Sequence, residues 1–353
     1  MKKLLSVLFA LLLLVSVSGC SGSNKADAEI HIFLPGEYIS QDVVNEFERQ
    51  TNIKVTIDNF ASNEEMYTKL LGGASYDVLI PSDYMIEKLI QENMLQEIDK
   101  SIIDNLDDLY EGVLNQEYDP NNDYSVPYFW GNVGIVYDST KVAEEDVMNQ
   151  GWEVLRNPKY KGILYMYDSA RDSFMIPLKV LGYSMNTDNE TELQEAYNWL
   201  LEQNQTMDVA YATDECIDGL AFATEGKYLG VMYSGDAAYI ISENENMRFY
   251  APKEGTNFWV DAMVIPSNAK NVKEANMFIK YMIEYDSQYD NSLEYCYSSV
   301  NKDALADLCG EDGEFYGNEA YLPRTRNNND EVFHTSEVNR KLTSELWNNI
   351  MMQ

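Results

Sequence analysis

Hydrophobic and polar residues alternate along segments 29–34 and 53–60, which predicts two β-strands. Between them, Val43, Val44 and Phe47 recur at helical spacing and predict a helix with one apolar face. The elements that continue this order are a helical pattern over 63–71 and a short apolar strand over 76–81. Such alternation predicts a sheet covered by helices, with ligand sites at the carboxyl ends of the strands.

The second half of the chain repeats this α/β order after a long extended segment. Residues 124–137 are rich in β-branched and aromatic side chains and contain Gly131 and Gly134, which predicts a strand that crosses between two domains. The elements predicted after it are strands over 163–167, 229–233 and 257–266 and helices over 174–181 and 192–201. We therefore expect two α/β domains.

The first twenty residues do not fit either domain. Lys2 and Lys3 precede an apolar run that is too short to span a bilayer, which is typical of a secretory signal peptide over residues 1–19. The sequence that ends at Cys20 resembles the lipobox of a bacterial lipoprotein, and this resemblance implies cleavage before Cys20 and attachment of lipid (palmitate) to its sulfur. Residues 20–28 would then form a lipid-anchored flexible tether.

Charge narrows the range of ligands. The 353 residues include 59 acidic and 25 basic side chains and carry a formal charge of −34. Such a field repels phosphate backbones, so we do not expect a nucleic-acid partner. It attracts a small cation, although many secreted proteins are acidic for solubility alone.

Motifs for catalysis, cofactors and metals are missing from the sequence. The two histidines, His31 and His334, support neither a histidine-bearing triad nor a zinc motif, and no phosphate-binding loop is present. The segment 119–123 opens like a calcium loop but has Tyr124 where glycine is required, so we expect a turn there. We expect no enzyme, cofactor or metal site, while a chance pair of carboxylates of the glycosidase kind stays open among 59 acids.

Three cysteines follow the predicted lipid anchor. Cys216, Cys296 and Cys309 form no CxxC pair. A disulfide between Cys296 and Cys309 stays open, because sequence alone cannot establish it.

Aromatic residues lie beside acids at several predicted strand ends. These pairs are Glu37 with Tyr38, Asp83 with Tyr84, Tyr233 with Asp236, and Trp259 with Asp261. A carboxylate balances the charge of an organic ammonium, and an aromatic face adds cation–π attraction of about 0.5 to 2 kcal/mol. The competing interpretation is that some of the 26 tyrosines lie half-buried at surfaces without a ligand.

Five segments resemble the substrate-binding proteins of spermidine/putrescine ABC importers. They are residues 62–101, 119–138 (DPNNDYSVPYFWGNVGIVYD), 167–174, 182–187 and 257–271. The resemblance implies an α/β, two-lobed periplasmic-binding-protein-like (type II) fold, with mixed sheets flanked by helices and the ligand in the interlobe cleft. The expected lobes are 29–136 with 262–315, and 137–261 with 316–353.

The resemblance also implies roles for individual residues. Asp172 would bind a terminal ammonium, Trp259 would pack on the methylene chain, and Asp261 would bind a nitrogen. The full set of expected ligand-binding residues is Glu37, Tyr38, Ser82, Tyr84, Ser169, Asp172, Thr213, Tyr233, Trp259, Asp261 and Tyr297. The chain departs from the family at Pro35, Ser169 and Tyr233, which leaves the choice among spermidine, putrescine and another amine open.

We therefore expect a monomeric, extracytoplasmic, lipid-anchored receptor at the face of a bacterial membrane. It would capture a polyamine by hinge closure of its lobes and deliver it to the transmembrane subunits of an ABC permease. The alternatives are a receptor of the same fold for another organic cation or small solute, a secreted glycosidase, and an adhesin or sensor without transport.

Overall fold

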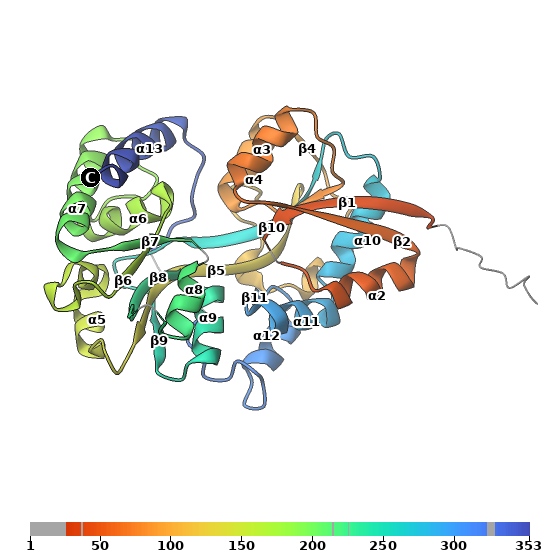
Figure 1. Cartoon of the computed structure of the whole chain (residues 1–353). Coiled ribbons are helices and arrows are strands. Elements are labelled where there is room, and N and C mark those ends of the chain that lie inside the picture. Colours follow the sequence, from red (N-terminus) through yellow and green to blue (C-terminus); the bar gives the residue numbers. More distant parts are fainter. Residues whose placement is uncertain (1–25, 37, 214, 225, 323–328) are drawn as a thin grey trace, which may run out of the picture.

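The computed structural model describes residues 26–353, except 37, 214, 225 and 323–328. The predicted signal peptide, the lipidation site Cys20 and Glu37 lie outside the described residues. The chain forms two lobes side by side, and two long strands, β5 (Ser125–Asp138) and β10 (Phe258–Pro266), run between them (Figure 1).

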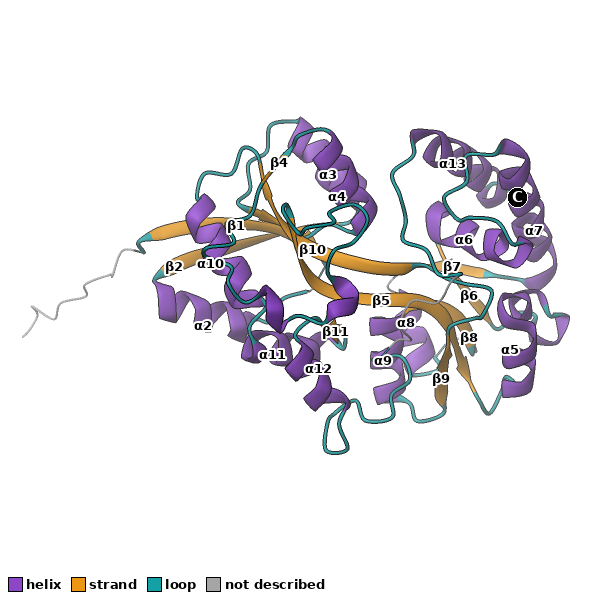
Figure 2. Ribbon diagram, turned by 180° about the vertical axis from the view of Figure 1, so that it is seen from behind, coloured by secondary structure: helices purple, strands orange, loops and turns teal. Residues whose placement is uncertain are grey.

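The first lobe has a mixed sheet in the order β2-β1-β3-β10-β5. Strand β1 pairs in parallel with β2 and β3, whereas β10 is antiparallel to both β3 and β5. The strands that complete this lobe are β1 (Ala28–Pro35), β2 (Ile53–Phe60), β3 (Val78–Leu79), β4 (Leu95–Gln96) and β11 (Ser298–Ser299). Its helices are α2 (Gln41–Thr51), α3 (Asn63–Leu71), α4 (Asp83–Gln91), α10 (Val272–Met282), α11 (Tyr285–Tyr295) and α12 (Lys302–Cys309), and they lie on both sides of the sheet (Figure 2).

The second lobe continues from the far end of β5. There β5 pairs antiparallel with β8 and β9, and β6 pairs in parallel with β8 and β7. Its strands are β6 (Leu164–Tyr167), β7 (Ala210–Ala212), β8 (Leu229–Tyr233) and β9 (Met247–Tyr250). Its helices are α5 (Glu144–Gln150), α6 (Ala170–Leu181), α7 (Glu190–Met207), α8 (Glu215–Ala221), α9 (Ser234–Glu243) and α13 (Glu337–Met351). Short 3-10 helices cover 106–108 and 111–113 before β5, and 151–156 and 158–160 after α5.

The two crossing strands are buried along their whole length. Every residue of β5 and of β10 is buried, because helices or strands cover both of their faces. Their pairing is interrupted by a register shift between Asp261 and Ala262, and such an irregularity re-aims neighbouring side chains. Gly131 of β5 lies beside this stretch, and a Cβ there would lie 2.7 Å from the Trp259 ring, so only glycine allows this close approach.

Several local predictions can be compared directly with the structure. The helix expected behind Ser40 is α2, and the Ser40 hydroxyl accepts the backbone N–H of Asp42 at 3.3 Å as an N-cap. The turn expected at 119–123 is also confirmed, since Asp119 accepts the backbone N–H groups of Asp123, Tyr124 and Ser125. The strand expected over 76–81 is shorter than predicted, because only Val78–Leu79 pair with neighbours.

The thiols of Cys296 and Cys309 form no disulfide in the described structure. Within the described ranges, no helix is long and apolar enough to cross a bilayer, and no group of three or more metal-binding side chains comes together. The mixed α/β architecture with two lobes agrees with the predicted fold class. The exact lobe boundaries stay a prediction.

Candidate functional site

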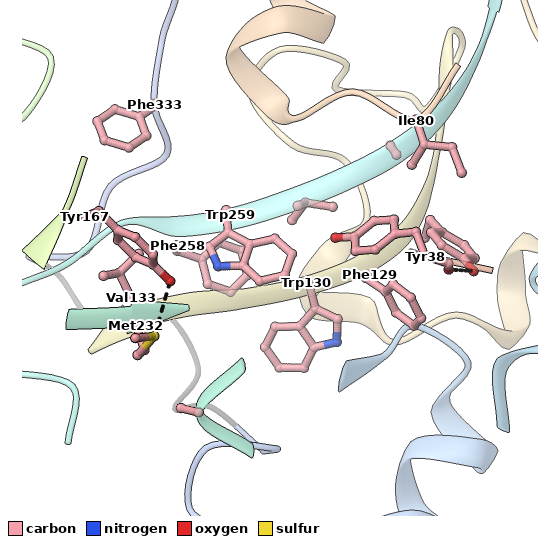
Figure 3. Packing of buried hydrophobic residues seen from close by; sticks show 14 of the residues in the cluster. Tyr38, Ile80, Phe129, Trp130, Val133, Tyr167, Met232, Phe258, Trp259 and Phe333 are labelled. Atoms are coloured by element: carbon pink, nitrogen blue, oxygen red, sulfur yellow. Dashed lines mark hydrogen bonds between the residues drawn. The ribbon is translucent and has the colours of Figure 1, made fainter. Parts of the chain in front are cut away.

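Aromatic rings from both lobes meet around the crossing strands. Tyr38 follows β1, Phe129 lies in β5, Tyr233 ends β8, Trp259 lies in β10, and Tyr297 precedes β11. Ring centroids are 5.3 Å apart for Tyr38 and Tyr297, 5.7 Å for Trp259 and Tyr297, and 6.0 Å for Tyr233 and Trp259, all in edge-to-face arrangement. Figure 3 shows the Tyr38 hydroxyl pointing along β10 toward Trp259. These rings form the wall of a shared site.

Asp261 is the carboxylate on the crossing strand. Its Oδ2 accepts the Tyr38 hydroxyl at 2.6 Å, and its backbone pairs with Ser82 in an isolated antiparallel bridge. The residue is 8% exposed, and burial raises the pKa of its carboxyl, while hydrogen bonds from Tyr38 and Ser82 lower it. A cation beside Asp261 would favour the charged carboxylate further.

Asp172 is the second buried carboxylate and lies in the first turn of α6. Ser169 caps this helix by accepting the Asp172 backbone N–H, and its hydroxyl donates to Asp172 Oδ2 at 2.6 Å. Burial raises the pKa of Asp172, and hydrogen bonds from Ser169 and Tyr233 oppose this shift. Ser169 therefore orients the acid, and its hydroxyl is already committed to it.

Asp236, at the start of α9, is a third acid at this site. The Tyr297 hydroxyl donates to Asp236 Oδ1 at 2.6 Å, and the Tyr167 hydroxyl lies 3.3 Å from Oδ2. Tyr297 belongs to the segment before β11, so this hydrogen bond joins one lobe to the other. We refer to Tyr38, Phe129, Asp172, Tyr233, Asp236, Trp259, Asp261 and Tyr297 as the acid–aromatic cluster.

Tyr84 lies in α4, beside the cluster, and one face of its ring is already covered. The guanidinium carbon of Arg171 lies 3.4 Å from the centroid of this ring, and Arg171 also pairs with Glu64 at 3.2 Å. An internal cation therefore occupies one face of this ring, and the expected role of Tyr84 in binding the ligand stays a prediction. No motif in the sequence singles out Arg171.

A pocket of about 240 Å³ opens next to the Arg171 and Tyr84 pair. One side comes from α3 and α4, with Glu64, Tyr67 and Lys88 among its lining residues, and the other side from α6, α13 and the segment before α13. The pocket is therefore interlobe, but its lining includes neither Asp172 nor Asp261. We regard this pocket as the path by which a ligand enters between the lobes. The acid–aromatic cluster is the candidate site.

The profile of the bacterial extracellular solute-binding proteins matches residues 42–315 of the chain. The chain belongs to this family. It is 36% identical over 253 residues to the spermidine/putrescine-binding periplasmic protein of Escherichia coli K12. The aligned region covers 71% of each protein. As members are solute-binding proteins, the chain is a receptor and not an enzyme, as the sequence predicted.

Solved structures of solute-binding proteins have the same fold. The substrate-binding protein of a spermidine/putrescine ABC transporter from Streptococcus pneumoniae superposes with a TM-score of 0.79 at 33% identity, over 92% of this chain and 99% of that one. A putative spermidine/putrescine ABC transporter protein from Listeria monocytogenes gives a TM-score of 0.81 at 32% identity over the same shares. The predicted two-lobed periplasmic-binding-protein-like fold is thereby confirmed.

The expected ligand-binding residues of this solute-binding protein are distributed unevenly. Tyr38, Tyr233, Trp259 and Tyr297, with Asp172 and Asp261, come together in the acid–aromatic cluster. Ser82 lies at the N-cap of α4, where its hydroxyl accepts from Asn63 Nδ2 at 3.2 Å. Thr213 is exposed at the end of β7 and donates to Glu215. The ligand roles of all these residues stay predictions.

Proposed function

We propose that this protein is a receptor for a polyamine, which it delivers to an ABC permease. The observation that carries the proposal is the pairing of two buried carboxylates, Asp172 and Asp261, with aromatic rings from both lobes. A diamine needs one carboxylate for each charged end and an apolar wall for its methylene chain. The relatives named for spermidine and putrescine support the same ligand class.

Burial of the site requires the lobes to move. Asp172 and Asp261 are each 8% exposed and Trp259 is 5% exposed, so a ligand reaches them only when the lobes separate. Asp172 belongs to α6 of the second lobe and Asp261 to the crossing strand β10. An amine held by both acids stabilises the closed arrangement, and hinge closure about β5 and β10 then presents one conformation to the permease.

The location follows from the family and the leader. Bacterial extracellular solute-binding proteins act outside the cytoplasm, and we place this chain there. We propose in addition that Cys20 carries the lipid that holds the receptor at the membrane, and that the receptor acts as a monomer. Mass spectrometry of the protein from membranes would detect the lipidated Cys20, and its Cys20→Ala variant would lack the mass of the lipid.

Calorimetric titration of residues 24–353 with putrescine, cadaverine, spermidine, spermine and choline tests the ligand class. We expect saturable binding of at least one polyamine and weaker binding of choline, which carries a single charge. Asp172→Asn and Asp261→Asn should each lower the affinity by about tenfold or more, because each leaves a desolvated ammonium without its counter-charge. Parental affinity in both variants would refute the assignment of these acids to the site. If folded, ligand-stripped protein binds none of the polyamines, the proposed function is refuted.

A further inference from the structure

A fourth acid, Asp83, lies directly behind the candidate site. It is the first residue of α4 and follows Ser82, whose backbone pairs with Asp261. Its side chain is 1% exposed. Oδ1 accepts the Tyr84 backbone N–H at 2.7 Å, but Oδ2 is buried and has no hydrogen-bond partner among the described residues.

An ionised carboxylate is costly in this position. A buried charge is tolerated when hydrogen bonds and an opposite charge compensate its lost hydration, and one oxygen of Asp83 lacks the hydrogen bond. The pKa of Asp83 is raised to about 8, mainly by burial and in smaller part by the nearby Asp261, against the lowering effect of the backbone N–H groups of Tyr84 and Val260 and of the Arg171 guanidinium. A protonated carboxyl is the form that fits these surroundings near neutral pH.

The groups around Asp83 come from three other elements. Asp261 faces it from β10, Arg171 from α6, and Tyr118 from the segment before β5. Arg171 is the cation of this set, and it lowers the pKa of Asp83. Arg171 belongs to the second lobe, so its distance from Asp83 changes whenever the lobes open or close.

We propose that Asp83 is a positioning residue that holds a proton in the ligand-free receptor and releases it when an amine cation binds beside Asp261 and the lobes close. This proposal rests on the proposed function. The O–H bond of the Asp83 carboxyl breaks and the proton passes to solvent, while the ligand keeps its charge. The charge of the amine offsets the repulsion between Asp83 and Asp261, which favours the charged form of Asp83 in the closed arrangement, where Arg171 already lies close enough to lower its pKa.

Proton release makes the affinity depend on pH in a defined direction. Putrescine is the probe, because its primary amines, like that of lysine, stay charged between pH 6.5 and 8. Binding that releases a proton strengthens as pH rises, by up to about tenfold per pH unit below the pKa of the free receptor. Calorimetry at pH 7.5 in buffers of different ionisation enthalpy would count about half a proton or more released per putrescine.

Asp83→Asn separates this role from a structural one, because the carboxamide copies the neutral acid without its titration. We expect the variant to bind putrescine like the parent near pH 6.5 and more weakly than the parent near pH 8, with proton release reduced. Asp77→Asn is the matched control, because Asp77 is also buried but accepts hydrogen bonds from His31, Lys270 and Asn271, which keep its pKa low. This control should release as many protons as the parent.

Outcomes for the two proposals are distinguishable. Equal proton release by the parent and Asp83→Asn, with normal binding by both, would overturn the role of Asp83 and leave the receptor function standing. If no amine binds, thermal unfolding of the ligand-free parent and of Asp83→Asn still tests whether Asp83 is protonated in the folded receptor. Because the pKa of Asp83 is raised in the folded state, the parent loses stability as pH rises toward 8. The melting temperature of Asp83→Asn, minus that of the parent, should therefore increase between pH 6 and 8.5. A constant difference would refute a protonated Asp83.

Discussion

Hydroxyl groups hold the buried acids of the candidate site in place. Tyr38 donates to Asp261 and Tyr297 donates to Asp236, each at 2.6 Å, and Ser169 donates to Asp172 at the same distance. Neutral donors of this kind stabilise a carboxylate without cancelling its charge, so the acids keep their attraction for an ammonium.

Replacing Tyr38 by phenylalanine removes the one hydroxyl that donates to Asp261 Oδ2 and so tests the contribution of this hydrogen bond. The variant keeps the ring but removes a hydrogen bond that lowers the pKa of Asp261. We expect about five- to thirtyfold weaker amine binding, and a loss of affinity on acidification that begins at a higher pH than in the parent. Tyr183→Phe, which removes a 2.8 Å bond to Glu195 at the surface, should bind like the parent in the same pH series of titrations.

Residues that act together across long distances in the sequence were the hardest to predict. The pairing of Asp236 with Tyr297 and of Arg171 with Tyr84 depends on how the lobes fold against each other, and no local spacing encodes it. The aromatic–acid rule did identify Tyr233 with Asp236 and Trp259 with Asp261, because these pairs lie close along the chain. It could not show that Tyr84 is covered by a cation.

Several secondary structure elements have the bounds that their sequence pattern predicted, including the buried strand β8 over 229–233. The strand over 53–60 and the helix over 63–71 match β2 and α3. Helix α6 begins at Ala170 and not at 174, because its first turn is defined by the Ser169 cap and the buried Asp172 and not by apolar spacing. Helix α4 was not predicted, and its start places Ser82 and Asp83 on a helix N-terminus instead of in a loop.

The crossing strand β5 offers a test at the scale of one element. A Cβ at position 131 would lie 2.2 Å from Ser234 Oγ and 2.7 Å from the Trp259 ring, so Gly131→Ala has to displace a wall of the site. We expect a loss of stability on the order of 1 to 3 kcal/mol and weaker amine binding. Gly134→Ala, in the same strand, would meet the Phe249 ring at 2.3 Å and should lose stability but keep the parental affinity. Thermal unfolding and titration of both variants separate the two effects, and equal affinities would contradict the role of Gly131.

Contacts between the lobes set the energy of closure for the whole molecule. On one side of the cluster, Arg171 pairs with Glu64 and stacks on Tyr84, and Lys88 of α4 pairs with Glu337 of α13 at 3.2 Å. Ion pairs exposed at the surface contribute little, and Glu337 is 63% exposed. Arg171, which stacks on a buried ring, should therefore contribute more to closure than Lys88.

Arg171→Gln should shift the equilibrium between closed and open receptor toward the open form. The apparent affinity of a receptor falls with the fraction of molecules able to close, so we expect about three- to tenfold weaker amine binding and a larger radius of gyration in small-angle scattering. Lys88→Gln is the control and should change both quantities little. Because Arg171 also lowers the pKa of Asp83, the Arg171→Gln receptor should release fewer protons per bound amine than the parent. Parental affinity and parental dimensions in Arg171→Gln would show instead that closure depends on the acids and the ligand, and that the stacked guanidinium only fills the space beside them.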